Sequence, residues 1–524
     1  MNPRLDNLVV EAQREGARIG LISTWDVENN AVRVLAATLR EANHHCTEIY
    51  FKDWVSNHID PANEVELANL GKVIRRERIN LICISIRASA YAYPSKDLTD
   101  YIQREFGIPV LWGGMHPTVA PNDCIDHCDL VLLGEGEYAL VDLADRLRDG
   151  SDEILETQNI WFNLNHGEVV KNPLRPLIRD LDTVPFRDYT THEHKFFITG
   201  NTYIQGDPMH GDPVFQMMGS RGCIYKCSYC YNSTYKKDVY PSQKWFRVRS
   251  PKSIMEEINA AREHWDFKRI RFDDEVFNFH KEWLDEFCEL YPKEVGLPFE
   301  VFIEPKLVKE DRVTKLANVG LDGVYMGIQS SERVTGHLYD RRVKNDNIVE
   351  IAKLFNRLGI YPHFQLIFDD PVSTEEDKKA LFDMVAAFPH PYDLYLFSMT
   401  VFPGSELNKK LIESGLISKY EVDGLNNTRV FYQHRVNLSY PRPVEDTFWI
   451  ALTQMLSKPF VPQAMLRTLS KSETLRKHPW PLIQVANASN FAKMGYLCGK
   501  MVANGEMTST LIRRWLSMDR LITT

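Results

Sequence analysis

The 524-residue sequence predicts an α/β protein with two strand–helix domains followed by a helical region. Two observations support this prediction. Short apolar runs alternate with helix-like stretches in two separate parts of the chain, and the alternation stops after about residue 420. A chain of this length usually divides into two or three domains. We therefore predict domains at 1–180, 213–420 and 421–524, with a linker at 181–212.

The first segment, 1–180, repeats a pattern of apolar strand, loop and helix. The strand-like runs are "ARIGLIS", "INLICISI", "PVLWGG" and "CDLVLLGEGE", and the helix-like "VRVLAATLREA" follows the first of them. Strands that alternate with helices predict a parallel, doubly wound sheet, whose ligands bind beyond the carboxyl ends of the strands. The residues expected at that edge are Ser85, Arg87, Gly113, Gly114, His116, Gly134 and Glu135.

The second segment, 213–420, contains six further strand–helix units. The strand-like runs are "VFQMMG", "RIRFDDE", "FEVFIEP", "GVYMGIQSS", "YPHFQLIFDDP" and "DLYLFSMTVFPG", and stretches such as "PKSIMEEINAAREH" have the pattern of helices. A complete barrel of this kind has eight units. Six units therefore predict an open, partial (β/α)6 barrel.

Two stretches lack this alternation of strands and helices. The link around "RDYTTHEHKFFITGNTYIQGDPMHGDP" is rich in Gly, Pro and His, and we predict a linker or a substrate loop there. After residue 420, "VEDTFWIALTQMLS" and "TSTLIRRWLSM" have the pattern of amphipathic helices. These helices would either cap the barrel or mediate self-association, and the sequence does not choose between the two.

Charge and composition exclude several classes of protein. A net charge of −9 gives no electrostatic case for nucleic acid or a membrane surface as a partner. No apolar run reaches the roughly 18 residues of a spanning helix, and the N-terminal stretch lacks the apolar core of a signal peptide. Nine cysteines, an odd number in a long chain, do not resemble a secreted disulfide framework. We therefore expect reduced thiols and a cytoplasmic location.

Three of the cysteines stand close together, as Cys223, Cys227 and Cys230 in "SRGCIYKCSYCYN". Thiolates bind iron–sulfur clusters one per iron, and a cubane has four irons, so three ligands leave one iron open. A small molecule with an amine and a carboxylate can chelate that iron. The alternative is a zinc knuckle with a histidine as fourth ligand. No histidine lies between Cys223 and His264, so we favour the cluster.

This trio, with the aromatic Tyr229 directly before its last cysteine, resembles the hallmark of the radical S-adenosylmethionine (SAM) enzymes. The resemblance continues in "FDDEVF", "FIEP", "GIQSSERV" and "YDRR". It implies a 4Fe–4S cluster on the three cysteines, which binds SAM and cleaves it to a 5′-deoxyadenosyl radical. Besides Tyr229, the SAM contacts that it implies are Asp273 and Asp274 for the amine, Glu304 for the ribose, Gln329 and Ser331 beside the cofactor, and Arg341 or Arg342 for the carboxylate. Asp369 and Asp370 precede Pro371 where many relatives have glycine, so no adenine contact is assigned there.

The first segment resembles the cobalamin-binding domain that precedes the radical domain in one large subclass of these enzymes. "WGGMHP" and "LGEGE" carry the similarity, and the two domains occur in the expected order. The resemblance implies that the residues expected at the sheet edge border a corrin, with paired glycines that allow close backbone approach. The pattern Asp-x-His-x-x-Gly, whose histidine binds cobalt, is missing. Either cobalt lacks a protein ligand, or His116 supplies one, or the domain keeps only the fold of a nucleotide-binding sheet.

Four cysteines of the first segment raise the alternative of a second cluster, as in the methylthiotransferases. They are Cys46, Cys83, Cys124 and Cys128. Cys83 falls within a predicted strand, and free cysteine is among the most buried residue types. We therefore predict that these four side chains pack in the core.

Together the two resemblances imply a cobalamin-dependent radical SAM enzyme that transfers a methyl group to an unactivated carbon of a small-molecule substrate. One SAM would methylate cobalt, and a second would yield the radical that takes hydrogen from the substrate. An external electron donor such as flavodoxin or ferredoxin is implied as well. Two alternatives stay open: a cyclase or rearrangement enzyme that uses cobalamin without net methylation, and a cobalamin-binding sensor without turnover.

Overall fold

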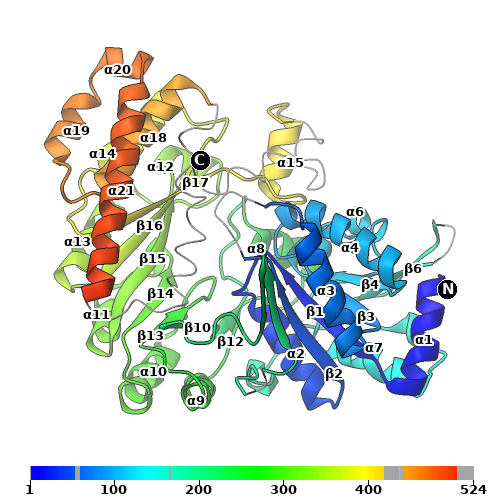
Figure 1. Cartoon of the computed structure of the whole chain (residues 1–524). Helices are drawn as coiled ribbons and strands as arrows, with labels where there is room; N and C mark the ends of the chain where they lie inside the picture. The colour runs from blue at the N-terminus through cyan, green and yellow to red at the C-terminus, as the bar shows by residue number, and fades with distance from the viewer. Residues whose placement is uncertain are drawn as a thin grey trace.

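The structure, a computed structural model, describes residues 2–53, 59–164, 167–190, 192–417, 436, 438 and 442–503. These residues form two strand–helix domains side by side, with a group of helices on the far side of the second domain (Figure 1). The helix expected in "TSTLIRRWLSM" lies outside the described residues. Within the described part of the chain, no helix has both the length and the hydropathy that a membrane span requires.

The first domain holds a sheet that has nine strands among the described residues. In spatial order they are β7 (Val169–Lys171), β6 (Ile160–Asn163), β5 (Leu130–Leu132), β4 (Val110–Gly113), β3 (Leu81–Ser85), β1 (Arg18–Thr24), β2 (His45–Phe51), β8 (Lys195–Thr199) and β9 (Thr202–Gln205). The strands from β5 to β8 are parallel. Antiparallel strands extend the sheet at both edges. The predicted parallel sheet is thus confirmed.

Helices cover both faces of this sheet, which makes the domain doubly wound. One face carries α1 (Pro3–Glu15), α2 (Asn30–Glu41) and α7 (Glu137–Asp149), and the other carries α3 (Glu64–Glu77), α4 (Ala92–Phe106) and α6 (Pro121–Ile125). β3 shows the reason, because successive side chains of a strand point to opposite faces. Leu81 and Cys83 pack in one core, and Ile82 and Ile84 in the other. The four cysteines of this domain are buried, as predicted.

Part of the segment that we predicted as a linker, 181–212, belongs to this sheet. β8 pairs with β2, and β9 forms a hairpin with β8 at the sheet edge. Gly200 and Asn201 make the turn, and Gly200 has a φ of +54°. A Gly-Asn pair between two strand-like runs is a hairpin signal. The many Gly, Pro and His residues around this pair obscured that signal.

The second domain holds a parallel sheet that has six strands among the described residues. In chain and spatial order they are β10 (Val214–Met217), β13 (Arg269–Phe272), β14 (Phe299–Ile303), β15 (Leu321–Gln329), β16 (Tyr361–Phe368) and β17 (Asp393–Ser398). The outer face carries α9 (Pro251–Arg262), α10 (Lys281–Glu294), α11 (Glu310–Asn318), α13 (Asn345–Arg357) and α14 (Glu375–Val385). In β16, Phe364 and Leu366 pack under these helices, so His363 and Gln365 belong to the inner face. The predicted partial barrel is confirmed.

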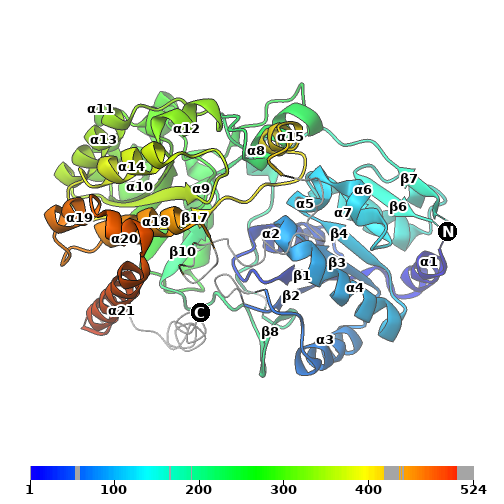
Figure 2. The ribbon, with the colours of Figure 1, turned by 90° about the horizontal axis from the view of Figure 1, so that it is seen from above.

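Short elements lie where the two domains meet. They include the 3-10 turn η1 (Ser89–Tyr91), α5 (Met115–Val119), α8 (Tyr231–Thr234), which continues into a π-helical turn at Tyr235–Val239, and α15 (Glu406–Glu413). β11 (Ser220–Arg221) and β12 (Arg247–Val248) form a separate antiparallel pair. Both views place α8 between the two sheets (Figures 1 and 2).

The described C-terminal residues are helical, as predicted. They form α18 (Val444–Leu456), α19 (Gln463–Leu469), α20 (Glu473–Lys477) and α21 (Trp480–Ala503). Phe448 and Trp449 of α18 are buried in the core of the barrel domain. α21 lies on the opposite side of the barrel sheet from α11 and α13 (Figure 2), and its Lys493 forms an ion pair with Asp393 of β17. These helices therefore pack on the barrel.

Candidate functional site

The cysteine loop lies beyond the carboxyl end of the first barrel strand, β10. It runs from β11 to α8 and carries Cys223, Cys227 and Cys230. Gly222 allows the loop to start here, because its φ is +80° and a Cβ would lie 2.5 Å from the Trp245 carbonyl oxygen. The Cys230 amide donates to the Cys227 carbonyl oxygen over 3.1 Å, which closes a turn between these two cysteines.

The spacing of the three sulfur atoms fits a cluster better than a single ion. A zinc ion with Zn–S bonds of about 2.3 Å would hold its sulfurs roughly 3.8 Å apart. In this part of the structure, no three cysteine, histidine or carboxylate ligand atoms lie within 4.8 Å of one another. Thiolates on separate irons of a cluster stand farther apart. Burial raises the pKa of the Cys223 thiol to about 11 and that of Cys230 to about 12, so bound metal is needed to keep them as thiolates.

Another group of described residues does place three ligand atoms within 4.8 Å of one another, but it does not suit a metal ion. His45, Glu77 and His194 gather at the amino ends of β2 and β8, at the opposite edge of the first sheet. Arg18 donates to His45 Nε2 over 2.8 Å. Burial and the nearby Arg18 lower the pKa of His45 to about 4. The Arg18 guanidinium is thus hydrogen-bonded to the His45 nitrogen that would have to bind the metal ion.

Arg341 is a buried donor beside the cysteine loop. Its side chain donates through Nε to Glu304 Oε1 over 3.3 Å, and the residue is only 5% exposed. Its Nη1 has no hydrogen-bond partner among the described residues. Leaving a buried guanidinium nitrogen unpaired is costly, and a carboxylate is the ligand best shaped to pair with it. Arg342 is exposed, so Arg341 is the one of the two predicted arginines that has the geometry for the SAM carboxylate.

Three other predicted SAM contacts surround this arginine. Burial lowers the pKa of Arg341, but Tyr229 and Glu304 outweigh burial and raise it above its ordinary value. Gln329 ends β15 with a φ of +75°, in the left-handed region. A Cβ on Gly327 would collide with Gln329 Nε2 and lie 3.0 Å from Arg341 Nη1, so this glycine lets the Gln329 amide approach the unpaired nitrogen. The residues present therefore fit a bound SAM.

The two predicted contacts for the SAM amine have partners within the protein. Asp274 is 3% exposed, accepts the Ser220 hydroxyl, and accepts the Gly219 amide over 3.4 Å. It thereby holds the strand that leads into the cysteine loop. Asp273 accepts from Arg271 over 2.6 and 3.0 Å and stays partly exposed. Of the two carboxylates, Asp273 is the one that can face a cofactor.

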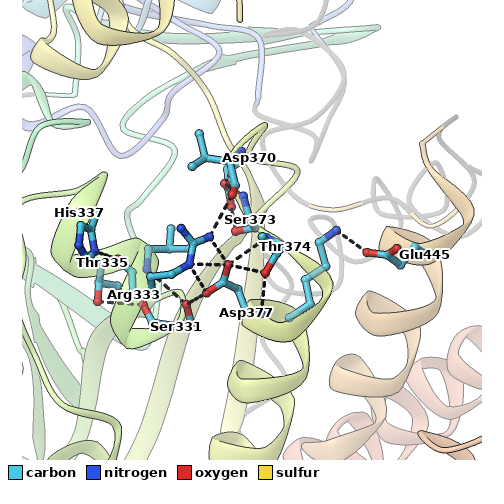
Figure 3. Close-up of polar contacts among 12 residues, drawn as sticks. Ser331, Arg333, Thr335, His337, Asp370, Ser373, Thr374, Asp377 and Glu445 are labelled. Atoms are coloured by element: carbon cyan, nitrogen blue, oxygen red, sulfur yellow. Dashed lines mark hydrogen bonds and ion pairs between the residues drawn. The ribbon is translucent and has the colours of Figure 1, made fainter. Parts of the chain in front are cut away.

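Ser331 belongs to a polar cluster at the start of α12 (Glu332–His337), shown in Figure 3. Its hydroxyl caps α12 and donates to Asp377 Oδ1 over 2.8 Å. Arg333 also donates to Asp377, from Nε over 2.9 Å. Asp370 accepts the Ser373 amide over 2.7 Å and turns the chain toward α14. The structure thus shows that Ser331 joins α12 to α14, and its contact with SAM stays a prediction.

The residues predicted to border cobalamin fall into two groups. Ser85, Arg87, Gly113 and Gly114 lie at the carboxyl ends of β3 and β4, next to the point between β1 and β3 where the strand order reverses. Ligands of doubly wound sheets bind at such a point. Arg87 keeps 60% of its side chain exposed while it pairs with Asp26 at 2.8 Å.

Buried polar atoms at the same edge also fit a bound cofactor. Thr24 Oγ1 and Trp25 Nε1, at the end of β1, have no hydrogen-bond partner among the residues described, although both side chains are buried. Gly114 has a φ of +106°, and a Cβ there would lie 2.8 Å from the Ile86 carbonyl oxygen. Cobalamin, whose corrin carries amide side chains, offers partners for these atoms. The edge therefore fits the predicted cofactor.

His116, of the second group, faces the barrel domain. Its Nδ1 lies 3.0 Å from Ser89 Oγ, which in turn lies 2.6 Å from the hydroxyl of Tyr231 in α8. All three residues are buried. The ring that we considered as a cobalt ligand is thus part of a hydrogen-bonded chain between the domains.

Gly134 and Glu135 also contact the second domain. Gly134 has a φ of +71°, and the Tyr240 hydroxyl occupies the place that a Cβ would take. Glu135 accepts from Arg221 over 2.8 Å and from Arg247 over 3.0 Å. These arginines are 86 and 112 residues away in sequence, so no local pattern reveals them. The structure thus shows that Glu135 joins the two domains, and its place at the corrin border stays a prediction.

Two polar residues next to the cysteines were missed by the sequence reasoning. Asn232 donates to Glu275 Oε2 over 3.0 Å and to Cys230 Sγ over 3.6 Å. Burial raises the pKa of Glu275, while Arg87 of the first domain and the hydrogen bond from Asn232 lower it, and the net shift is upward. The available signals were an asparagine two residues after the trio and a third acidic residue in "FDDEVF".

An open cavity lies between the domains and is lined by residues of both. Its lining includes Arg33, His192, Lys195, His210 and Gln216. The rings of His192 and His210 stand 5.1 Å apart, edge to face. Since Phe215 and Met217 pack outward under the helices, Gln216 belongs to the inner face of the barrel. The cavity therefore adjoins the barrel interior and is a candidate substrate site.

Two family models match the chain. The B12 binding domain matches residues 22–144, and the Radical SAM superfamily matches residues 217–385. The first match covers the parallel part of the first sheet from β1 to β5, and the second contains the cysteine loop. The matches follow one another in the order of the two structural domains.

Three curated relatives are similar over more than half of the chain. An uncharacterized methyltransferase of Pyrococcus horikoshii is 24% identical over 68% of this chain and 74% of the relative. The bacteriochlorophyllide d C-8(2)-methyltransferase of Chlorobaculum tepidum is 23% identical over 60% of this chain and 65% of the relative. The anaerobic magnesium-protoporphyrin IX monomethyl ester cyclase of Rubrivivax gelatinosus is 23% identical over 72% of this chain and 65% of the relative. The chain thus spans between 65% and 74% of the length of these relatives.

Solved structures share the fold. The radical SAM methyltransferase TsrM from Kitasatospora setae, with cobalamin and a 4Fe–4S cluster bound, has a TM-score of 0.60 at 14% identity and covers 91% of this chain and 100% of that chain. The cobalamin-dependent radical SAM enzyme OxsB, with aqua-cobalamin bound, has a TM-score of 0.60 at 15% identity over 97% of this chain and 80% of that chain. The two family matches and this common fold lead to one conclusion: the chain contains a radical SAM domain preceded by a B12-binding domain, and the cofactors that these domains imply are a 4Fe–4S cluster, SAM and cobalamin.

Proposed function

We propose that this protein is a cobalamin-dependent radical SAM methyltransferase that acts on an unactivated carbon of a small molecule. The observation that carries this proposal is the direct contact between the cysteine loop and the B12-binding domain, made by Tyr231 and Ser89 at 2.6 Å. This contact brings the two regions proposed to hold the cofactors to one interface. Two relatives that are named methyltransferases support the same reaction.

The residues of the chain hold and orient the cofactors. When bound, the cluster and SAM supply hydrogen-atom abstraction, and cobalamin supplies methyl-group transfer. Cys223, Cys227 and Cys230 bind three irons of the cluster and leave the fourth iron open. Arg341 pairs its Nη1 with the SAM carboxylate and so orients SAM over the barrel.

The remaining site residues divide by their partners. The proposed SAM contacts are Tyr229, Glu304 and Gln329, which lie near Arg341, and Asp273, whose side chain stays partly exposed. The proposed cobalamin contacts at the open sheet edge are Ser85, Arg87, Gly113 and Gly114. The predicted cofactor contacts that also have partners within the protein are Asp274, Ser331, His116, Gly134 and Glu135.

The proposal also includes the domain boundaries, the electron donor, the location and the kind of partner. We place domain boundaries at 1–180, 213–420 and 421–524, and we count the β8–β9 hairpin of 181–212 with the first sheet. A one-electron donor such as flavodoxin or ferredoxin reduces the cluster, because cleavage of SAM consumes an electron. All nine cysteines are free of disulfides, which supports the reducing cytoplasm as the location. The net charge of −9 supports a partner other than nucleic acid.

A cyclase is the second candidate. Similarity to the magnesium-protoporphyrin IX monomethyl ester cyclase favours it, because that relative covers 72% of this chain. Such an enzyme would use the same cofactors without net methylation. A cobalamin sensor without turnover fits less well, since a binding module has no use for an oxygen-sensitive cluster.

Product analysis separates these candidates. Anaerobically reconstituted protein, loaded with hydroxocobalamin, is incubated with dithionite, methyl-labelled SAM and fractionated small-molecule extracts. Methyl transfer predicts 5′-deoxyadenosine and S-adenosylhomocysteine together, with label in an acceptor. Deoxyadenosine alone supports the cyclase. If protein with full iron and corrin content forms neither product, the enzyme assignment is wrong and the sensor is favoured.

A further inference from the structure

Asn232 contacts the cysteine loop and two partners that fix how its amide is turned. It follows Cys230 by two residues, at the start of α8, and is 8% exposed. Its Oδ1 accepts from Trp245 Nε1 over 2.7 Å. Its Nδ2 donates to Glu275 Oε2 over 3.0 Å and to Cys230 Sγ over 3.6 Å. Each end of the amide therefore has its own partners.

Trp245 decides the orientation of this amide. The oxygen and nitrogen of a side-chain amide have nearly the same shape, so hydrogen-bond partners must assign them. An indole N–H only donates, and a carboxylate only accepts. Asn232 must therefore turn its oxygen to Trp245 and its nitrogen to Glu275. The second N–H of that nitrogen is then left for the Cys230 sulfur.

The indole itself is held in place by its neighbours. Trp245 stacks on Tyr235, with ring centroids 4.9 Å apart and an interplanar angle of 26°. Its Nε1 lies 2.8 Å from the place where a Cβ on Gly222 would stand. Only glycine at that position leaves room for the ring. Gly222 thus both starts the cysteine loop and admits the indole that orients Asn232.

We propose that Asn232 is a positioning residue that raises the reduction potential of the bound cluster, by donating an N–H to the Cys230 thiolate. This goes beyond the proposed methyl transfer and rests only on the cluster. Hydrogen bonds to the sulfurs are one of the means by which a protein sets a cluster potential. A donor stabilises the reduced, more negative cluster. Its loss therefore makes uptake of the electron less favourable.

Redox titrations of the reconstituted holoprotein, followed by EPR, test this proposal. Asn232→Leu removes both N–H groups at similar volume and should shift the midpoint potential to more negative values. Asn232→Asp replaces the donor by an acceptor and should shift it further in the same direction. Trp245→Phe keeps a stacking ring but removes one of the two partners that orient the amide, so it should give at most part of the leucine shift.

Ser233→Ala is the matched control. Ser233 also contacts Cys230, but its hydroxyl donates to the carbonyl oxygen over 2.7 Å and not to the sulfur. The potential of this variant should equal that of the wild type. Iron and sulfide are measured first, so that loss of the cluster is not mistaken for a change in its potential.

Two results would overturn the inference. One is an Asn232→Leu protein with full cluster content and the wild-type potential. If that variant binds no cluster, Asn232→Asp decides in its place, and an unchanged potential there contradicts the role of Asn232. A wild-type protein that binds no iron would instead contradict the cluster assignment, so the two failures are distinguishable.

Discussion

The hydroxyl of Tyr231 lies 2.6 Å from the hydroxyl of Ser89, across the junction of the two domains. Ser89 continues this contact to His116 Nδ1 at 3.0 Å. Tyr231 directly follows the last cluster cysteine, and Ser89 lies in the connection between β3 and α4, at the edge where the corrin is expected. A buried chain of hydrogen bonds thus joins the two cofactor regions through protein atoms.

Tyr231→Phe should loosen this connection while it keeps the ring that packs on Phe402 with centroids 4.3 Å apart. Loss of one buried hydrogen bond lowers the free energy of unfolding by about 1 kcal/mol, which urea titrations can measure. The ratio of 5′-deoxyadenosine to methylated product should rise, because the two cofactor regions are held less firmly. In a double-mutant cycle with Ser89→Ala, the double variant should lose less than the sum of the single losses. Strictly additive losses would mean that the two hydroxyls do not interact.

Cys227→Ala should abolish uptake of the cluster. Two remaining thiolates no longer hold three irons of a cubane, so the visible iron–sulfur absorbance and the bound iron should both be lost after reconstitution. Cys498→Ala, which removes a cysteine of α21, serves as the control and should retain full iron content. Full iron content in Cys227→Ala would rule out the three-thiolate site.

Arg341→Lys should weaken SAM binding, because lysine keeps the charge but lacks the planar fork that matches a carboxylate. A hydrogen bond to a charged group contributes about 1.5–3 kcal/mol, so the dissociation constant should rise on the order of 10- to 100-fold. Calorimetric titration of the cluster-loaded protein measures this change. Arg342→Lys alters the exposed neighbour and should bind like the wild type. Equal losses in both variants would argue against a specific role for Arg341.

Glu135→Gln should weaken the contact between the domains in a pH-dependent way. Burial raises the pKa of Glu135, but Arg221 and Arg247 outweigh burial, and the net pKa lies below its ordinary value. The stabilisation from this carboxylate is therefore present above its unfolded pKa of about 4.3 and is lost as the pH falls through the folded pKa.

Urea unfolding of the glutamine variant should accordingly show a loss of about 1.5–3 kcal/mol near neutral pH, and the loss should shrink in acid. Glu153→Gln changes an exposed carboxylate and should cost less than about 0.5 kcal/mol. A loss at Glu135 that stays constant down to acid pH would contradict the lowered pKa.

Asp274→Asn should remove a pH dependence of the opposite sign. Burial raises the pKa of Asp274 to about 7, although hydrogen bonds from Ser220 and Gly219 act against burial. From about pH 4, where the unfolded carboxyl releases its proton, up to the folded pKa, only the folded state binds this proton. Stability should therefore fall as the pH rises through this window. Urea unfolding of the cofactor-free protein at several pH values should show this fall in the wild type, and a much smaller fall in the variant.

Much of the fold could be predicted because its signals are short and local. Apolar runs indicated the strands, and the alternation with helices indicated two parallel sheets. The hairpin of β8 and β9 escaped, since both strands are short, β9 is half exposed, and their Gly200–Asn201 turn stands among many other loop-forming residues. The cysteine spacing needed no knowledge of the fold at all.

The sequence by itself determined the order of the two domains and the three cysteines that hold the cluster, because each of these is written in one continuous stretch of chain. The tertiary structure alone decided which polar residues meet. Arg341 is buried while its neighbour Arg342 is exposed, and Glu135 finds Arg221 from 86 residues away. Such pairings depend on how segments distant in sequence pack against one another, and a local pattern of residues does not contain this information.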